Sequence, residues 1–207
     1  MAEQESLDWT SSRLCLDFAN TADWHDSDDP EEKLGSYTNL VSWSREAHIL
    51  TERQVRQLLD EAERRPEEAA STLEQAIALR ETIFRIFSAV AEGTPVAELD
   101  LEALNAALSP ALSRLRVTPS EKGYGWKWAA EGDELDRMLW LVARSAGELL
   151  TSDERSRVRK CAGYPCGWLF LDTSKNQSRR WCDMKSCGNR AKARRHYARI
   201  RAGTRAP

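Results

Sequence analysis

Apolar side chains recur along the first three quarters of the chain with the spacing of helices that bury one face. The signal is strongest between Leu135 and Leu150, where the apolar residues fall on one helical face. A capping box, Thr51-Glu52-Arg53-Gln54, marks where an earlier helix begins. The pattern predicts helices over 37–47, 51–62, 67–92, 101–108 and 135–150, a buried helix or turn over 14–20, and a loop over 21–36.

A different period appears between the last two of these helices. Residues 113–118 alternate between apolar and basic side chains, and Trp126 and Trp128 flank Lys127 in the same way. Alternation with period two predicts a β-hairpin that has one apolar face. The tryptophans before residue 150 are expected in the core, with the lining of a small-molecule pocket as the alternative. They are Trp24, Trp43, Trp126, Trp128 and Trp140.

The last quarter of the chain has a different composition. Residues 152–160 are polar and basic and are expected to form a linker, and helical spacing returns over 189–201. The expected fold is mainly α, with two parts. Residues 1–150 would form a helical N-terminal domain with one β-hairpin, and residues 151–207 a small four-cysteine module that ends in a basic helix.

The charges divide at the same place. The whole chain carries 30 Lys and Arg against 33 Asp and Glu, a net charge of −3. Residues 155–207 hold 15 of the basic residues and two of the acidic ones, which puts +13 on this segment and leaves −16 on the rest. Such an asymmetry predicts two parts with different partners, and the basic part favours a polyanion.

Four of the five cysteines lie in the basic segment, as two C-x4-C pairs separated by 15 residues: Cys161, Cys166, Cys182 and Cys187. Two short loops that each offer two thiolates can supply the four tetrahedral ligands of zinc. Because all four positions are cysteine, none stays open for water. One structural zinc per chain is therefore predicted, rather than a catalytic one. Cys15 is expected to be a small buried hydrophobe.

Three other fates of these cysteines stay open. Free surface cysteines are hard to reconcile with four cysteines in 27 residues. Disulfides are disfavoured, because the N-terminus lacks the basic start and apolar stretch of an export signal. An iron–sulfur cluster would also accept four thiolates. No apolar run approaches the roughly 20 residues of a membrane span, so a cytoplasmic protein without membrane contact is expected.

Basic side chains surround the cysteine pairs. Lys192, Arg195 and Arg199 would share one side of the last helix, while Tyr197 and Ile200 would pack on the zinc core from another side. Clustered guanidinium and ammonium groups bind phosphates and release counterions, which favours DNA as a partner. The candidate DNA-binding residues are Lys175, Arg179, Arg180, Arg190, Lys192, Arg194, Arg195 and Arg199.

The basic cluster has alternative roles. It could be a solvated tail, a patch that docks on the acidic N-terminal domain, an RNA-binding module or a zinc-stabilised protein-interaction module. Arg190 lies so close to the last cysteine that it could instead cap the metal core or pair with Asp183.

At Cys187-Gly188-Asn189-Arg190 the chain resembles the CGNR zinc finger of bacterial proteins. In those proteins the finger follows an ABATE domain, described as a stress-induced transcription regulator. LCLDFANT (14–21) and AIALRETIFRIF (76–87) are similar to that domain. The resemblance covers nearly the whole chain. It implies that the four cysteines bind zinc and that the finger binds DNA, and it names neither an effector nor a target sequence.

An ABATE-like domain is expected to act as a sensor, by binding a small effector or by forming a homodimer. The candidate effector-binding residues are Asp17, Asn20 and Trp43; for Asp17 and Asn20, hydrogen bonding at a helix end is the alternative role. The three histidines are expected on the surface. None is placed with a nucleophile, and the sequence has no Gly-rich phosphate loop, so an enzyme is not expected.

Overall fold

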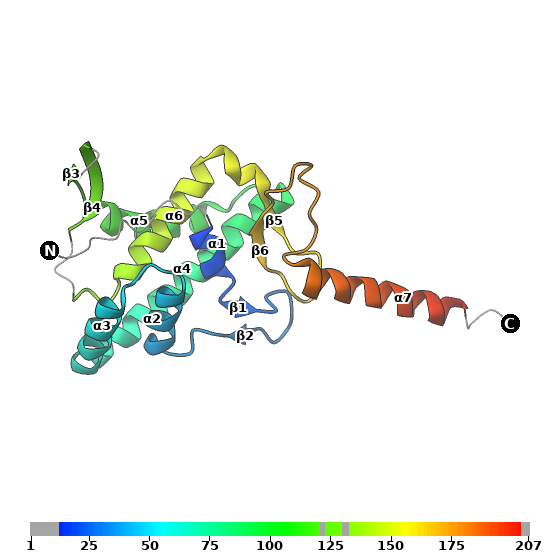
Figure 1. Cartoon of the computed structure of the whole chain (residues 1–207), viewed down its shortest axis with the longest axis horizontal. Helices are drawn as coiled ribbons and strands as arrows, with labels where there is room; N and C mark the ends of the chain where they lie inside the picture. The colour runs from blue at the N-terminus through cyan, green and yellow to red at the C-terminus, as the bar shows by residue number, and fades with distance from the viewer. Residues whose placement is uncertain (1–12, 121–122, 130–132, 204–207) are drawn as a thin grey trace.

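The computed structural model describes residues 13–120, 123–129 and 133–203 (Figure 1). These ranges contain seven α-helices and three two-stranded antiparallel sheets, so the predicted mainly α fold class is confirmed. The helices are α1 (Leu14–Ala19), α2 (Tyr37–Glu46), α3 (Glu52–Arg64), α4 (Pro66–Glu92), α5 (Glu98–Ser113), α6 (Arg137–Thr151) and α7 (Asn189–Gly203). The strands are β1 (Ala22–Asp23), β2 (Glu31–Glu32), β3 (Leu115–Ser120), β4 (Gly123–Trp128), β5 (Val158–Lys160) and β6 (Leu169–Leu171). A 3-10 segment, η1 (Asp153–Arg157), and a π-helical turn, η2 (Met184–Gly188), complete the chain.

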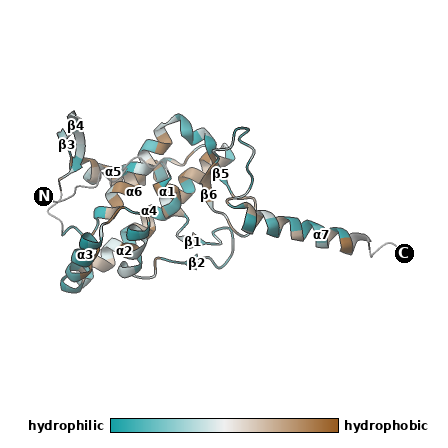
Figure 2. Ribbon diagram, viewed as in Figure 1, coloured by the Kyte–Doolittle hydropathy of each residue, from teal (hydrophilic) through white to brown (hydrophobic). Residues whose placement is uncertain are grey.

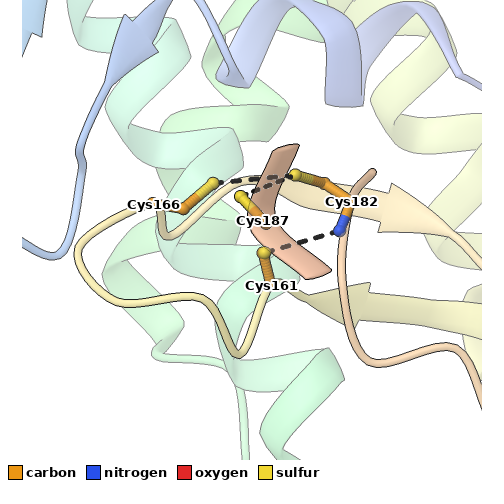
Figure 3. Close-up of side chains that lie close together, drawn as sticks. All are labelled: Cys161, Cys166, Cys182 and Cys187. Carbon is orange, nitrogen blue, oxygen red and sulfur yellow. Dashed lines mark hydrogen bonds between the residues drawn. The ribbon is translucent and has the colours of Figure 1, made fainter. Parts of the chain in front are cut away.

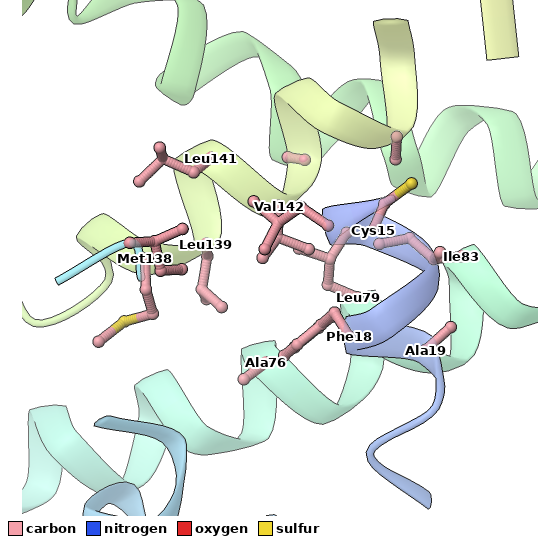
Figure 4. Close-up of a cluster of buried hydrophobic side chains, with 14 of the residues drawn as sticks. Cys15, Phe18, Ala19, Ala76, Leu79, Ile83, Met138, Leu139, Leu141 and Val142 are labelled. Atoms are coloured by element: carbon pink, nitrogen blue, oxygen red, sulfur yellow. The ribbon is translucent and has the colours of Figure 1, made fainter. Parts of the chain in front are cut away.

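The main core lies where α1, α4 and α6 meet (Figure 4). Cys15 and Phe18 of α1 are fully buried there, against Ile83 of α4 and Val142 of α6. Burial raises the pKa of the Cys15 thiol to about 12, so this cysteine stays neutral as a small hydrophobe. The hydrophobic colours of Figure 2 gather on these inner helices, while α3 and α7 are largely hydrophilic.

Local signals set most helix ends. At the start of α3, the Thr51 hydroxyl accepts from the Gln54 backbone N–H at 3.3 Å, and the Gln54 side chain accepts from the Thr51 N–H at 2.8 Å. This confirms the predicted capping box. α4 begins at Pro66 and ends at Glu92. Gly93 caps it with a φ of +69°, a left-handed conformation that glycine adopts without strain. α5 starts earlier than the predicted 101–108, because acidic side chains in its first turn favour that start, and it continues to Ser113.

The predicted hairpin is present as β3 and β4. The register pairs Leu115 with Trp128 and Val117 with Trp126. Trp128 packs against Trp140 of α6, with ring centroids 5.8 Å apart. Trp126, in contrast, is 59% exposed, so its expected place in the core is wrong. The outer half of the hairpin extends beyond the helices (Figure 1). The alternating pattern is the same in both halves of the hairpin, so the sequence could not show that Trp126 is exposed.

Residues 152–160 are not a linker throughout. Val158 begins β5, which pairs with β6 in the register Val158↔Leu171. Val158, Leu169 and Leu171 are buried in the main core together with α1 and α4. A single valine among basic residues has no periodic pattern, which is why the linker expectation failed. The C-terminal part supplies the β5–β6 hairpin to the N-terminal core, so the two parts share buried residues. The division into residues 1–150 and 151–207 remains a prediction.

A buried arginine fastens the 22–33 segment, which includes β1 and β2, to α4. The Arg80 side chain is 4% exposed, and its two terminal nitrogens donate to the Glu32 carboxylate at 2.6 and 2.7 Å. Arg80 Nε donates to Glu81 at 2.9 Å. Burial raises the pKa of Glu32, but the hydrogen bonds from Arg80 outweigh this effect and the pKa lies below its usual range.

Glu32→Gln is expected to lower the free energy of unfolding by about 1–2 kcal/mol at neutral pH. The variant leaves a buried guanidinium with one carboxylate partner, and the solvent access of Glu32 keeps the cost below that of a fully buried pair. The stabilisation is present above the unfolded-state pKa of about 4.3 and is lost as the pH falls through the lower folded pKa.

Urea unfolding of both proteins at about pH 7 and about pH 3 measures this linkage. The difference between wild type and Glu32→Gln should shrink in acid. Glu31→Gln, on the same strand and exposed, is the matched control and should change little. A difference that is equal at both pH values would contradict the assignment.

Candidate zinc centre and nucleic-acid interface

Four cysteine sulfurs converge at one point beside β5 and β6 (Figure 3). Cys161 and Cys166 lie in the loop between these strands, Cys182 precedes η2, and Cys187 lies within it. All four Sγ atoms lie within 4.8 Å of one another, and all are free thiols. The Sγ atoms of Cys166 and Cys182 are 3.7 Å apart, and those of Cys182 and Cys187 are 3.6 Å apart. A tetrahedron with zinc–sulfur bonds of about 2.3 Å has edges of about 3.8 Å, so the spacing fits zinc.

Hydrogen bonds among the thiols lower the pKa of Cys161 and raise the pKa of Cys166 and Cys182. Donors from the backbone and from an arginine stabilise the thiolate forms that a metal requires. The Cys182 backbone N–H points at Cys161 Sγ at 3.4 Å. Arg190 Nη2 donates to Cys187 Sγ at 3.1 Å, which makes Arg190 a cap on the metal core. Asp183 is not the partner of Arg190; it accepts from Ser186 N at 2.7 Å and caps η2.

Two glycines let the chain pass close to this centre. A Cβ at Gly163 would lie 3.0 Å from Cys187 Cβ and 3.4 Å from two ligand sulfurs. Gly167 has a φ of +69°, and a Cβ there would lie 3.0 Å from the Asp26 backbone nitrogen. The residues present therefore fit one structural zinc ion. All four ligand positions are thiolates, so the zinc would organise the fold and would leave no position for a substrate.

Not all of the candidate DNA-binding residues are equally available. The Arg179 guanidinium donates to the carbonyl oxygens of Trp181, at 2.9 Å, and Cys182, and it lies over the Phe170 ring at 4.7 Å. The buried carboxylate of Asp172 accepts from the Arg179 N–H at 2.9 Å. Arg179, like Arg190, thus holds the finger together. The charge pattern alone could not show whether an arginine has this structural role or binds DNA.

The other six candidates are exposed, and within the described ranges none of them forms an ion pair with a carboxylate. They are Lys175, Arg180, Lys192, Arg194, Arg195 and Arg199. α7 carries four of these and projects from the body of the protein (Figure 1). Tyr197 and Ile200 are 65% and 52% exposed, so the expectation that they pack on the zinc core is wrong. The first turn of α7 reaches the zinc core, and the rest of the helix projects away from the protein surface.

A basic groove of about 240 Å³ separates the first cysteine loop from the start of α7. Arg180, Arg194 and Arg195 line it together with Arg190, and Tyr164 and Trp181 add aromatic walls. The Arg194 guanidinium lies 5.9 Å from the centroid of the Tyr164 ring. The lining contains no carboxylate. Such a groove suits a phosphate group, which guanidinium groups bind with paired hydrogen bonds.

The three candidate effector residues have different surroundings. Asn20 Nδ2 donates to the Leu169 carbonyl at 2.8 Å, and Asn20 Oδ1 accepts from the Leu169 N–H at 2.9 Å. The side chain therefore pairs with β6 rather than with the end of its own helix. Trp43 packs against Phe18 with ring centroids 4.9 Å apart, and Asp17 is exposed. The effector site remains a prediction.

The 22–33 segment joins the two parts of the chain. His25 was expected on the surface, but its side chain is 8% exposed. Its ring stacks on the Phe84 ring, with the centroids 3.7 Å apart. Its backbone N–H donates to the Cys166 carbonyl at 3.2 Å. Lys160 pairs with Asp26 at 2.8 Å. Sequence reasoning missed this interface, because its contacts join residues far apart in the sequence.

Asn20→Ala is expected to lower the free energy of unfolding by about 1–3 kcal/mol, since it leaves the buried Leu169 backbone groups without partners. Amide exchange at Leu169 should accelerate, while exchange within α6 should change less. Asp17→Ala, in the preceding turn and exposed, is the matched control and should have little effect. Unchanged Leu169 exchange in Asn20→Ala would show that this pairing does not hold the finger in place.

Two family models match the chain. Residues 157–200 match the CGNR zinc finger, and residues 12–153 match the ABATE family, whose description is "putative stress-induced transcription regulator". The chain belongs to the ABATE family. The ABATE match ends just before Val158, and the CGNR match includes β5, β6, the four cysteines and most of α7. A search of curated proteins gives no match.

The architecture is thus an ABATE domain followed by a CGNR zinc finger, as the resemblance implies. Both families are of a regulatory or zinc-finger type. Among the helices of the described ranges, none has the length and apolar character that a membrane span requires.

Proposed function

We propose that this protein is a transcription regulator whose CGNR finger binds duplex DNA through α7 and the 175–180 loop. The observation that carries the proposal is the row of exposed cations on a helix that projects from the zinc centre. Lys192, Arg195 and Arg199 share one side of α7, and no carboxylate of the described residues neutralises them. A projecting basic helix can reach phosphates, or enter a major groove, without a clash from the rest of the chain.

The zinc centre would fix the direction of this helix. Cys187 and Arg190 join the first turn of α7 to the metal core, so the helix starts from a rigid base. The basic groove beside Tyr164 would hold a phosphate next to that first turn. The ABATE domain carries the excess negative charge and would stay away from the DNA backbone.

The ABATE domain would supply the regulatory part, through a small effector or through self-association. The all-thiolate zinc site supports a binding function rather than catalysis. The experiment that tests the proposal is a titration of the zinc-loaded full chain with duplex DNA and with RNA of equal length, at several salt concentrations. Five phosphate contacts predict a slope of log affinity against log salt of about −4 to −5 for duplex DNA.

A flat salt dependence would overturn DNA binding and favour a protein-interaction role. Tighter binding to RNA than to duplex DNA would favour an RNA-binding role. If the chain binds duplex DNA as proposed, selection of bound sequences from random duplex DNA would define the target sequence.

A further inference from the structure

One face of the β3–β4 hairpin is apolar along its whole length. The register places three pairs on this face: Leu115 with Trp128, Val117 with Trp126, and Pro119 with Tyr124. The opposite face carries Arg116 with Lys127, Thr118 with Gly125, and Ser120 with Gly123. We call the six residues of the first set the aromatic face.

Among the described residues, the ABATE core covers only the base of the aromatic face. Trp128 packs on Trp140, but farther out Val117 is 60%, Trp126 59% and Tyr124 80% exposed. Leu112, at the adjoining end of α5, is 48% exposed. A two-stranded hairpin is marginally stable in water unless its apolar face is packed. Contiguous exposed apolar patches of this kind mark interaction sites.

We infer that the aromatic face is the homodimer interface of this protein, packed against the same face of a second copy. This names the surface for the self-association in the proposed function, and it does not depend on DNA binding. The outer side chains expose on the order of 500 Å² per copy, given about 150–250 Å² for a fully buried aromatic residue. Two copies would therefore bury about 1,000 Å², the lower limit for a specific interface.

The distribution of charge favours a second copy as the occupant. The basic residues Arg116 and Lys127 are on the opposite face of the hairpin. Two aromatic faces can therefore pack about 10 Å apart without bringing like charges of these paired strands together. The interface is isologous, because Val117 and Trp126 of each copy offer the same surface to the other. An interface of this size lies at the weak, transient end of protein–protein interfaces.

The position of the hairpin has a consequence for the whole assembly. The hairpin and α7 lie at opposite ends of the molecule (Figure 1). A dimer formed through the aromatic face leaves both zinc fingers free, so each copy can engage its own DNA site.

The test is sedimentation equilibrium of the zinc-loaded full chain, under reducing conditions, from about 1 to about 200 μM, a range in which weak dimers of micromolar dissociation constant form. The expected mass rises from the 23.5 kDa of one chain towards twice that value. Trp126→Glu and Tyr124→Glu should remain monomeric over the whole range. Lys127→Glu places the same charge on the opposite face of the same strand and should associate like the wild type.

Thermal unfolding and zinc content show whether each variant is folded. Trp126 and Tyr124 are mostly exposed, so both variants should match the wild type in these respects, and both should keep single-site DNA binding. A wild type that stays monomeric at 200 μM, or glutamate variants that dimerise like the wild type, would overturn the inference. Growth beyond a dimer would indicate strand-edge pairing and would overturn the face-to-face arrangement.

Discussion

Cys161→Ser is expected to abolish zinc binding and to unfold the finger. The second apolar cluster of the protein consists of Cys161, Cys166, Phe170 and Cys187, with Trp168, Trp181 and Cys182 around it. Most of these residues are the ligands themselves, so little apolar packing remains without the metal. Zinc contributes about 10–16 kcal/mol of apparent binding free energy to such modules, far more than this cluster could replace.

We propose that the ABATE domain survives the loss of zinc, since its core is centred on α1, α4 and α6. The β5–β6 hairpin shares that core and should loosen without unfolding it. Elemental analysis should give one zinc per wild-type chain and none for Cys161→Ser. Circular dichroism of the variant should keep most of the helical signal, and amide exchange should become fast from Cys161 to α7.

Cys15→Ala is the matched control, because Cys15 is buried in the main core away from the zinc ligands. It should keep a full equivalent of zinc, although its cavity should lower the overall stability. Full zinc content in Cys161→Ser would contradict the ligand set. Collapse of the whole helical signal on treatment with a chelator would contradict the division near residue 150.

The second large effect concerns DNA. Replacement of Lys192, Arg195 and Arg199 by alanine should reduce the slope of log affinity against log salt by about 3, one unit for each lost phosphate contact. At a salt concentration of about 0.1 M, three contacts correspond to a loss of affinity of at least a hundredfold. Zinc content should not change, because all three side chains are exposed and distant from the ligands.

A control must remove the same charge elsewhere. Arg53, Arg56 and Arg64 are exposed residues of α3, on the ABATE domain. Their replacement by alanine also changes the net charge by three units but should leave the salt slope unaltered. Equal losses in both triple variants would mean that net charge, rather than α7, controls binding. Arg179→Ala and Arg190→Ala should behave differently again and lose finger stability, because both side chains hold the finger together.

The helices and the metal centre could be predicted because their signals are local. The apolar period of 135–150 predicted α6, and Thr51 with Gln54 predicted the start of α3. The paired cysteine spacing predicted a four-thiolate site, since each loop places two sulfurs together whatever the rest of the chain does. The hairpin and its apolar face also followed from alternation, but the pairing of its residues and the exposure of Trp126 did not.

The sequence by itself therefore determined the elements, the zinc ligands and the separation of charge, all of which depend on residues close together in the chain. Tertiary structure alone decided which basic residues are held inside the finger, that Asn20 pairs with Leu169, and that His25 is buried. The Asn20 and His25 contacts join segments far apart in sequence. The partners of Arg179 and Arg190 lie only a few residues away, but a polar side chain has the same local pattern whether its partner is water or a nearby protein group. The same reason applies to the aromatic face: alternation predicts an apolar face, but only the packing of α6 shows how much of that face the chain covers.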